Sequence, residues 1–103
     1  MAQWYQNLYV GKKASRYAEK IRRRVNKGRY MNDLYLITAC ENGYDQLEIL
    51  DGACLMQPEV VERLPLIIGI ALGKKEAIGL VAEIADTAYR VDEKKDIREY
   101  LGI

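Results

Sequence analysis

Nine of the sixteen lysines and arginines lie within residues 12–29, and this stretch contains a single acidic residue, Glu19. The stretch carries a formal charge of +8, while the rest of the chain sums to −7. On a helix, at about 100° per residue, six of these cations fall within one stripe roughly 100° wide. The six are Lys13, Arg16, Lys20, Arg23, Arg24 and Lys27. Such a stripe can follow a line of phosphates, because guanidinium groups bind phosphate oxygens through paired hydrogen bonds.

Two interpretations of this stripe stay open. Tyr17 and Tyr30 lie close to it in the sequence and offer rings for base stacking, which favours single-stranded nucleic acid as the partner. Alternatively, the cations pair with carboxylates, either on an acidic partner protein, on the chain itself or on a second subunit. The nearly neutral total charge of +1 weighs towards self-pairing or a solvated face rather than a polyanionic partner.

A second candidate anion site is the stretch Gly69-Ile70-Ala71-Leu72-Gly73-Lys74-Lys75, at a predicted strand-to-helix junction. A helix N-terminus at this point could bind an anion. The stretch is not a Walker A loop, because one spacer residue is missing and Glu76 stands where the magnesium-binding Ser or Thr belongs. The alternative is structural: Gly73 makes a tight turn and Gly69 allows close packing.

Residues that catalysis needs are scarce. The chain has no His, which removes the usual acid–base group at neutral pH and the commonest metal ligand. Cys40 and Cys54 form no C-x-x-C pair, and we expect them to be reduced, buried small hydrophobic residues. Four acids cluster around a predicted turn without matching a calcium loop: Glu41, Asp45, Glu48 and Asp51. We therefore assign no catalytic residue, no metal ligand and no cofactor.

The basic stripe requires a helix over residues 12–27. Its apolar residues repeat with the helical period and form one face: Ala14, Tyr17, Ala18, Ile21 and Val25. Gly28 suits the position just after the helix. A second long helix is predicted over 74–91 and a short one over 58–63, which begins at Pro58. Asp92 is predicted to cap a final short helix that ends at Gly102.

Strands are predicted over 7–10, 33–40, 45–50 and 66–72. A two-residue Asn42-Gly43 turn would pair Leu36 with Ile49 and Thr38 with Leu47 on the core face. The other face of this hairpin would then carry Tyr35, Ile37, Gln46 and Glu48. The stretch 66–72 is almost wholly apolar, as expected of a strand that is buried on both sides.

This order of elements predicts an α+β fold: a two-layer sandwich of three or four mainly antiparallel strands, with both long helices on one face. The first topology we consider is ferredoxin-like. It would put the apolar strand 66–72 at a sheet edge, so either the strand order differs or a second subunit covers that edge. The second option motivates a homodimer hypothesis.

The 103 residues, half of them apolar, fit one domain spanning 1–103. Residues 1–6 contain neither the basic nor the apolar region of a signal peptide, and no apolar run is long enough to span a bilayer. We therefore expect a cytoplasmic protein that does not contact the membrane.

Three segments together resemble a known group: Asn7-Leu8-Tyr9-Val10-Gly11, Asp45-Gln46-Leu47-Glu48-Ile49, and Ile68-Gly69-Ile70-Ala71-Leu72-Gly73 with Glu76-Ala77. They are similar to small uncharacterised proteins from anaerobic Gram-positive bacteria, and the resemblance covers most of the chain. It implies a stand-alone bacterial protein, but no activity and no catalytic residues.

The sequence thus predicts a non-catalytic binding or regulatory module that docks an anionic partner through the basic helix 12–27. The first alternative is a structural or self-associating module whose basic helix pairs with its own acidic residues. A small enzyme ranks last, because no nucleophile–base pair, metal set or cofactor motif is present.

Overall fold

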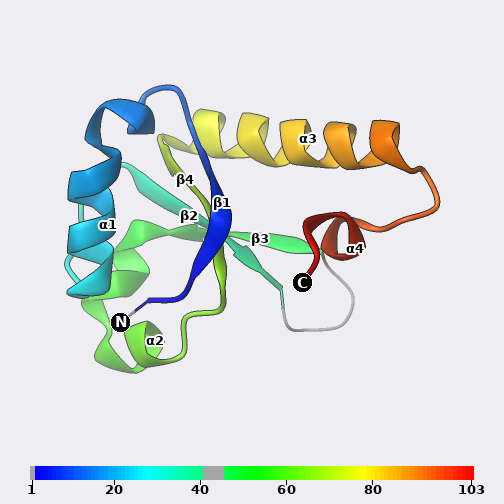
Figure 1. Ribbon diagram of the computed structural model, residues 1–103. Coiled ribbons are helices and arrows are strands. Elements are labelled where there is room, and N and C mark those ends of the chain that lie inside the picture. Colours follow the sequence, from blue (N-terminus) through cyan, green and yellow to red (C-terminus); the bar gives the residue numbers. More distant parts are fainter. Residues whose placement is uncertain (1, 41–45) are drawn as a thin grey trace.

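The computed structural model describes residues 2–40 and 46–103 of the chain. The strands are β1 (Trp4–Val10), β2 (Leu34–Ala39), β3 (Leu47–Asp51) and β4 (Ile67–Leu72) (Figure 1). A 3-10 turn, η1 (Ala14–Tyr17), leads into helix α1 (Ala18–Asn26). A second 3-10 turn, η2 (Gly52–Met56), precedes α2 (Pro58–Glu62). The chain ends with the long helix α3 (Lys74–Val91) and the short helix α4 (Ile97–Leu101).

The four strands form one sheet in the order β1-β4-β2-β3. β4 is parallel to β1 and antiparallel to β2, and β2 is antiparallel to β3. The predicted α+β class with a mainly antiparallel sheet and a short C-terminal helix is therefore confirmed. The ferredoxin-like order is wrong, because β4 is inserted between β1 and β2 instead of lying at an edge. Its central place explains why residues 67–71 are all buried, and it removes the need for a subunit to cover β4.

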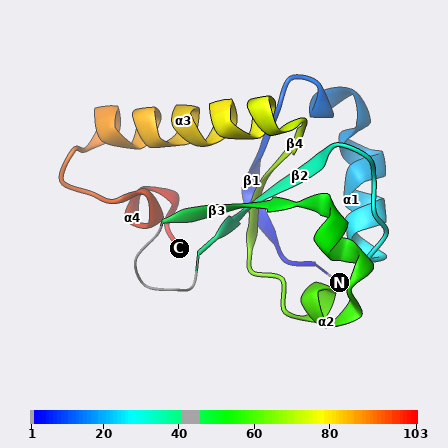
Figure 2. The same ribbon diagram turned by 180° about the vertical axis from the view of Figure 1, so that it is seen from behind.

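The two long helices cover opposite faces of the sheet, which corrects the predicted two-layer arrangement (Figures 1 and 2). On one face, Ile21 and Val25 of α1 pack with sheet residues such as Leu36. On the other, Leu80 and Ile84 of α3 pack with the next residue of β2, Ile37, among others. Neighbouring residues of a strand point to opposite faces, so these two clusters are separated by the sheet.

The pairing of β2 with β3 differs by one residue from the predicted register. Leu36 lies opposite Leu50, and Ile37 lies opposite Ile49. A shift of one residue moves every side chain of one strand to the other face relative to its neighbour. Ile49 therefore packs on the α3 side of the sheet. The predicted Asn42-Gly43 turn lies outside the described residues.

The predicted ends of the helices are largely confirmed. α1 ends where Gly28 adopts a φ of 66°, a left-handed conformation that glycine enters without steric cost. The N–H groups of Gly28 and Arg29 donate to the carbonyls of Val25 and Arg24, which is the Schellman pattern. The predicted capping role of Asp92 is wrong: Asp96 caps α4, and its carboxylate accepts the N–H of Glu99 at 2.7 Å.

The Cα radius of gyration is 13.1 Å, close to the roughly 13 Å of a compact domain of about 100 residues. Within residues 2–40 and 46–103, no helix combines the length and the apolar character that crossing a bilayer requires.

Candidate anion-binding surface

The η1–α1 segment buries its apolar side and exposes most of its cations. Ala14, Ile21 and Val25 are fully buried in the core. Five of the six predicted cations are exposed: Lys13, Arg16, Lys20, Arg23 and Lys27. From Arg16 onward they follow each other three or four positions apart, which places them along one ridge of the helix. We call these five residues the basic surface.

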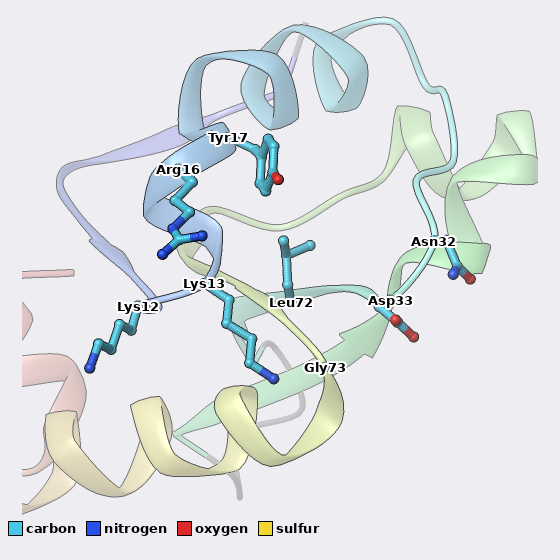
Figure 3. A pocket seen from close by; sticks show the side chains of 8 residues that line it. All are labelled: Lys12, Lys13, Arg16, Tyr17, Asn32, Asp33, Leu72 and Gly73. Carbon is cyan, nitrogen blue, oxygen red and sulfur yellow. The ribbon is translucent and has the colours of Figure 1, made fainter.

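A pocket of about 700 Å³ opens at the N-terminal end of the basic surface. Its lining comes from three parts of the chain: Lys12, Lys13, Arg16, Tyr17, Asn32, Asp33, Leu72 and Gly73. In Figure 3, η1 and the residues before it contribute the cations on one side, and the loop before β2 contributes the amide and the carboxylate on the other. The lining therefore offers positive charge, hydrogen-bonding groups and an apolar contact at Leu72.

Tyr17 differs from the prediction that it belongs to the buried face. Its side chain is 47 % exposed and lines the pocket beside Arg16. An aromatic ring that stays open to solvent among cations can stack on a planar group of a ligand. Tyr30, the other ring considered for stacking, is half-buried and therefore less exposed than Tyr17. Its hydroxyl lies 3.4 Å from the side-chain oxygen of Asn32.

The carboxylate of Glu76 holds the two sides of this region together. One oxygen accepts the backbone N–H of Lys13 at 2.5 Å, and the other accepts the backbone N–H of Leu72 at 2.7 Å. Gly11 lies directly against the same carboxylate, since a Cβ built there would be 2.4 Å from its carbon. Glu76 is thus a positioning residue that fixes the start of η1 against the start of α3.

The two candidate anion sites found in the sequence meet at this pocket. Gly73, the residue before α3, has a φ of 91° and lines the pocket together with Lys13 and Arg16. Its N–H donates to the carbonyl of Asp33 at 2.7 Å, which ties the start of α3 to the loop before β2. The positive end of the dipole of this 18-residue helix therefore lies next to two cations.

Arg24 faces away from the basic surface. Its guanidinium donates to the carbonyl of Tyr30 at 2.7 Å, and the side chain is half-buried. Arg22, which lies outside the predicted stripe, stacks on the ring of Trp4 at 4.9 Å from the ring centroid. Arg24 thus contributes to the fold around α1, whereas Arg22 is exposed and contacts Trp4.

Lys27 lies on the same ridge of the helix but does not line this pocket. It lines a separate hollow at the other end of α1, together with Glu62 and residues of η2 and α2. The structure therefore brings Lys13 and Arg16 together in one pocket, leaves Lys20 and Arg23 along the helix, and places Lys27 at its far end.

Ion pairing does not neutralise the basic surface within residues 2–40 and 46–103. The one salt bridge among these residues joins Arg90 and Asp86 on α3, at 3.1 Å. Asp33 brings a carboxylate to the pocket lining without forming a salt bridge to another described residue. The self-pairing that the sequence left open is thus not seen in the described part of the chain.

The sequence did not predict three residues of the pocket lining, Lys12, Asn32 and Asp33, or the positioning residue Glu76 as site residues. The position of Glu76 could have predicted its role. It is the third residue of α3, and an acid at that position often accepts a backbone N–H from the residues before the helix. Asn32 and Asp33 gave a weaker signal, as Asn and Asp commonly form the turn before a strand, and Asp33 indeed has a φ of 62°.

The remaining candidate chemistry is sparse in the described residues. Both cysteines are free thiols, and burial raises the pKa of Cys54, which works against a reactive thiolate. The carboxylate of Asp51 accepts the N–H of Ala53 at 2.9 Å and so serves the turn into η2. Glu41 and Asp45 lie outside the described residues, and no group of three metal-ligating side chains occurs in the others.

Comparison with known proteins gave no family model, no curated protein and no solved structure that matches this chain. The resemblance to small proteins of anaerobic Gram-positive bacteria therefore stays a prediction.

Proposed function

We propose that this protein is a non-catalytic module that docks single-stranded nucleic acid through the basic surface and the pocket at its N-terminal end. The observation that carries this proposal is the combination of exposed cations with an exposed aromatic ring. Lys13 and Arg16 line the pocket without a salt bridge to another described residue, and Tyr17 and Leu72 line the same pocket. Cations bind phosphates, and the ring offers a stacking platform for a base.

The same observation favours nucleic acid over an acidic protein. An acidic peptide needs cations alone, whereas a ring that is 47 % exposed and an apolar contact at Leu72 also suit a flat, weakly polar group. A nucleic-acid strand with unpaired bases supplies both the phosphates for the cations and the flat bases for the ring, at regular spacing. We propose the cytoplasm as the compartment, because the two cysteines are free and an oxidising compartment favours disulfides.

Fluorescence anisotropy with a short labelled single-stranded oligonucleotide tests the proposal. We expect binding that weakens steeply with salt, because each phosphate contact releases a counterion. The double variant Lys13→Glu/Arg16→Glu should lower both the affinity and the salt slope, the slope by about 1 for each lost contact. The control is Lys94→Glu/Lys95→Glu, which changes the net charge equally at exposed residues outside the pocket lining. Absence of oligonucleotide binding at low salt would overturn the proposal.

The variant Tyr17→Ala separates stacking from charge. We expect it to weaken oligonucleotide binding by about 5- to 150-fold, the range that corresponds to one stacked base, while the salt slope stays unchanged. Binding to heparin, which has no bases, should not change. If Tyr17→Ala leaves the oligonucleotide affinity intact and heparin binds equally well, the surface recognises polyanions in general and the choice of nucleic acid is wrong.

The self-associating alternative makes the opposite prediction for Arg16→Glu/Arg23→Glu. If these arginines pair with the chain's own acids, the variant should lose stability or change its assembly. If they serve a ligand, thermal unfolding should stay nearly unchanged, because substitutions at exposed positions without partners have small effects. The lack of a described ion pair from residues 12–29 supports the second outcome.

A further inference from the structure

The outer side of α3 carries an apolar stripe that no described element covers. Ile78 is 52 % exposed and Tyr89 is 64 % exposed, and both lie on the side of α3 away from the sheet. Ala82 and Ala85 lie between them, at helical spacings of four, three and four residues. Figures 1 and 2 both show α3 along one border of the molecule with no other element outside it.

The order of residues along this stripe is self-complementary. In an antiparallel pair of α3 helices, Ile78 of one copy comes opposite Tyr89 of the other, and Ala82 comes opposite Ala85. Two large side chains then lie at the ends of the contact, while small residues at its centre allow the helix backbones to approach closely. A two-fold symmetric interface requires such a match between a surface and itself.

The charges at the two ends of α3 complement each other in the same register. Lys74 and Lys75 open the helix, and Asp92 and Glu93 follow its end. The register that pairs Ile78 with Tyr89 brings Lys75 opposite Asp92 and Lys74 opposite Glu93. A parallel arrangement would instead place lysines against lysines and align the two helix dipoles.

We propose that this face of α3 binds a second copy of the chain, with the two α3 helices antiparallel. With two large apolar side chains from each copy, the contact belongs to the small interfaces of under about 1,200 Å², which form weakly and reversibly. The dimer is therefore concentration-dependent.

The dimer would also set the spacing of the two pockets. Gly73 lines the pocket at the start of α3, so antiparallel helices carry their pockets at opposite ends. In this register Gly73 of one copy comes opposite position 94 of the other, 21 residues from that copy's Gly73, so at about 1.5 Å per residue the separation is roughly 30 Å along the helix axis. This proposal does not depend on what the pocket binds.

Sedimentation velocity over a concentration series of the full chain, without nucleic acid, tests the dimer. We expect the average mass to rise from monomer towards dimer, and Ile78→Glu or Tyr89→Glu to raise the dissociation constant roughly tenfold or more. The control is Val91→Glu, at a side chain 66 % exposed on another side of α3, which should dimerise like the wild type. Circular dichroism confirms that each variant folds.

A charge exchange tests the register. Lys74→Glu should weaken the dimer, and adding Glu93→Lys should restore it, because the pair is re-formed with its signs exchanged. A wild type that remains monomeric at every concentration overturns the proposal. A dimer that Val91→Glu disrupts and Ile78→Glu does not would use another surface and also overturns it. Oligonucleotide binding by the Ile78→Glu monomer reports separately on the pocket.

Discussion

Helices α1 and α3 both bury one apolar side against the sheet, yet their outer sides have opposite characters. The outer side of α1 displays Lys20 and Arg23, whereas that of α3 displays Ile78 and Tyr89. The buried sides hold the fold together and are alike in chemistry. Both outer sides are exposed, and we propose that they serve different partners: an anion on α1 and another apolar surface on α3.

The sheet separates these two surfaces. Because α1 and α3 pack on opposite faces, each outer side is turned towards a different part of the surroundings. Glu76 connects them: it belongs to α3, and its carboxylate accepts the backbone N–H of Lys13, just before η1.

The largest expected effects come from the two cores. Ile21→Ala and Ile84→Ala each remove a fully buried side chain, and each should lower the free energy of unfolding by about 2–5 kcal/mol. The two residues belong to separate clusters on either face of the sheet, so the losses in the double variant should add to within about 0.5 kcal/mol. Urea unfolding measures this. A large deviation from additivity would show that the two faces do not act independently.

The link between the helices is tested by Glu76→Gln. A glutamine offers one acceptor oxygen to the two N–H groups that the carboxylate now binds, so one of them loses its partner. We expect a loss of about 1–3 kcal/mol in the free energy of unfolding. Glu83→Gln is the matched control on the exposed side of the same helix and should change stability by less than about 0.5 kcal/mol. Equal effects of the two variants would contradict the positioning role of Glu76.

A smaller effect of opposite sign is expected at Gly79, an exposed position inside α3. A Cβ at this position meets no atom within 4 Å, so Gly79→Ala should stabilise the protein by about 0.5–1 kcal/mol through helix propensity. Thermal unfolding gives the measurement. The same substitution at Gly11 should destabilise, because its Cβ would displace the carboxylate of Glu76. Stabilisation by Gly11→Ala would contradict the close contact between Gly11 and the carboxylate of Glu76.

A pH dependence of the free energy of unfolding is expected only under alkaline conditions. Burial, together with a hydrogen bond to Tyr100, raises the pKa of Tyr9 from 10.0 to about 12. The folded state therefore favours the neutral phenol, and this contribution is complete below pH 10 and lost as the pH rises through 12. The stability difference between wild type and Tyr9→Phe should shrink over this interval in urea unfolding. A difference that stays constant would contradict the raised pKa.

Local signals predicted local structure well. Gly73 and the helical repeat of apolar residues after it predicted a helix over 74–91, which is where α3 lies. Gly28, predicted to follow the first helix, adopts the left-handed conformation at the end of α1. The predicted helix 12–27 is only in part an α-helix: Ala14–Tyr17 form the 3-10 turn η1, and α1 begins at Ala18, after Tyr17 departs from helical angles with a φ of −126°. At the candidate site, periodicity found Lys13 and Arg16, but it could not find Asp33 or Glu76, which come from distant parts of the chain.

The register of the β2–β3 hairpin shows why pattern alone was insufficient. When one face of a strand is buried and the other is exposed, alternation fixes the register. Here Leu36 and Ile37 are both fully buried, on opposite faces, so both registers satisfy the apolar pattern. The prediction therefore depended on the length assumed for the turn and was wrong by one residue.

Sequence alone determined the long helix α3, the C-terminal end of α1 and the concentration of positive charge in residues 12–29, since these depend on neighbours a few positions apart. Only the tertiary structure decided the place of β4 at the centre of the sheet, the opposite faces taken by α1 and α3, and the meeting of Lys13 with Gly73. The physical reason is that an amphipathic stripe records that a surface is buried, but not which surface buries it. That choice depends on contacts between residues tens of positions apart.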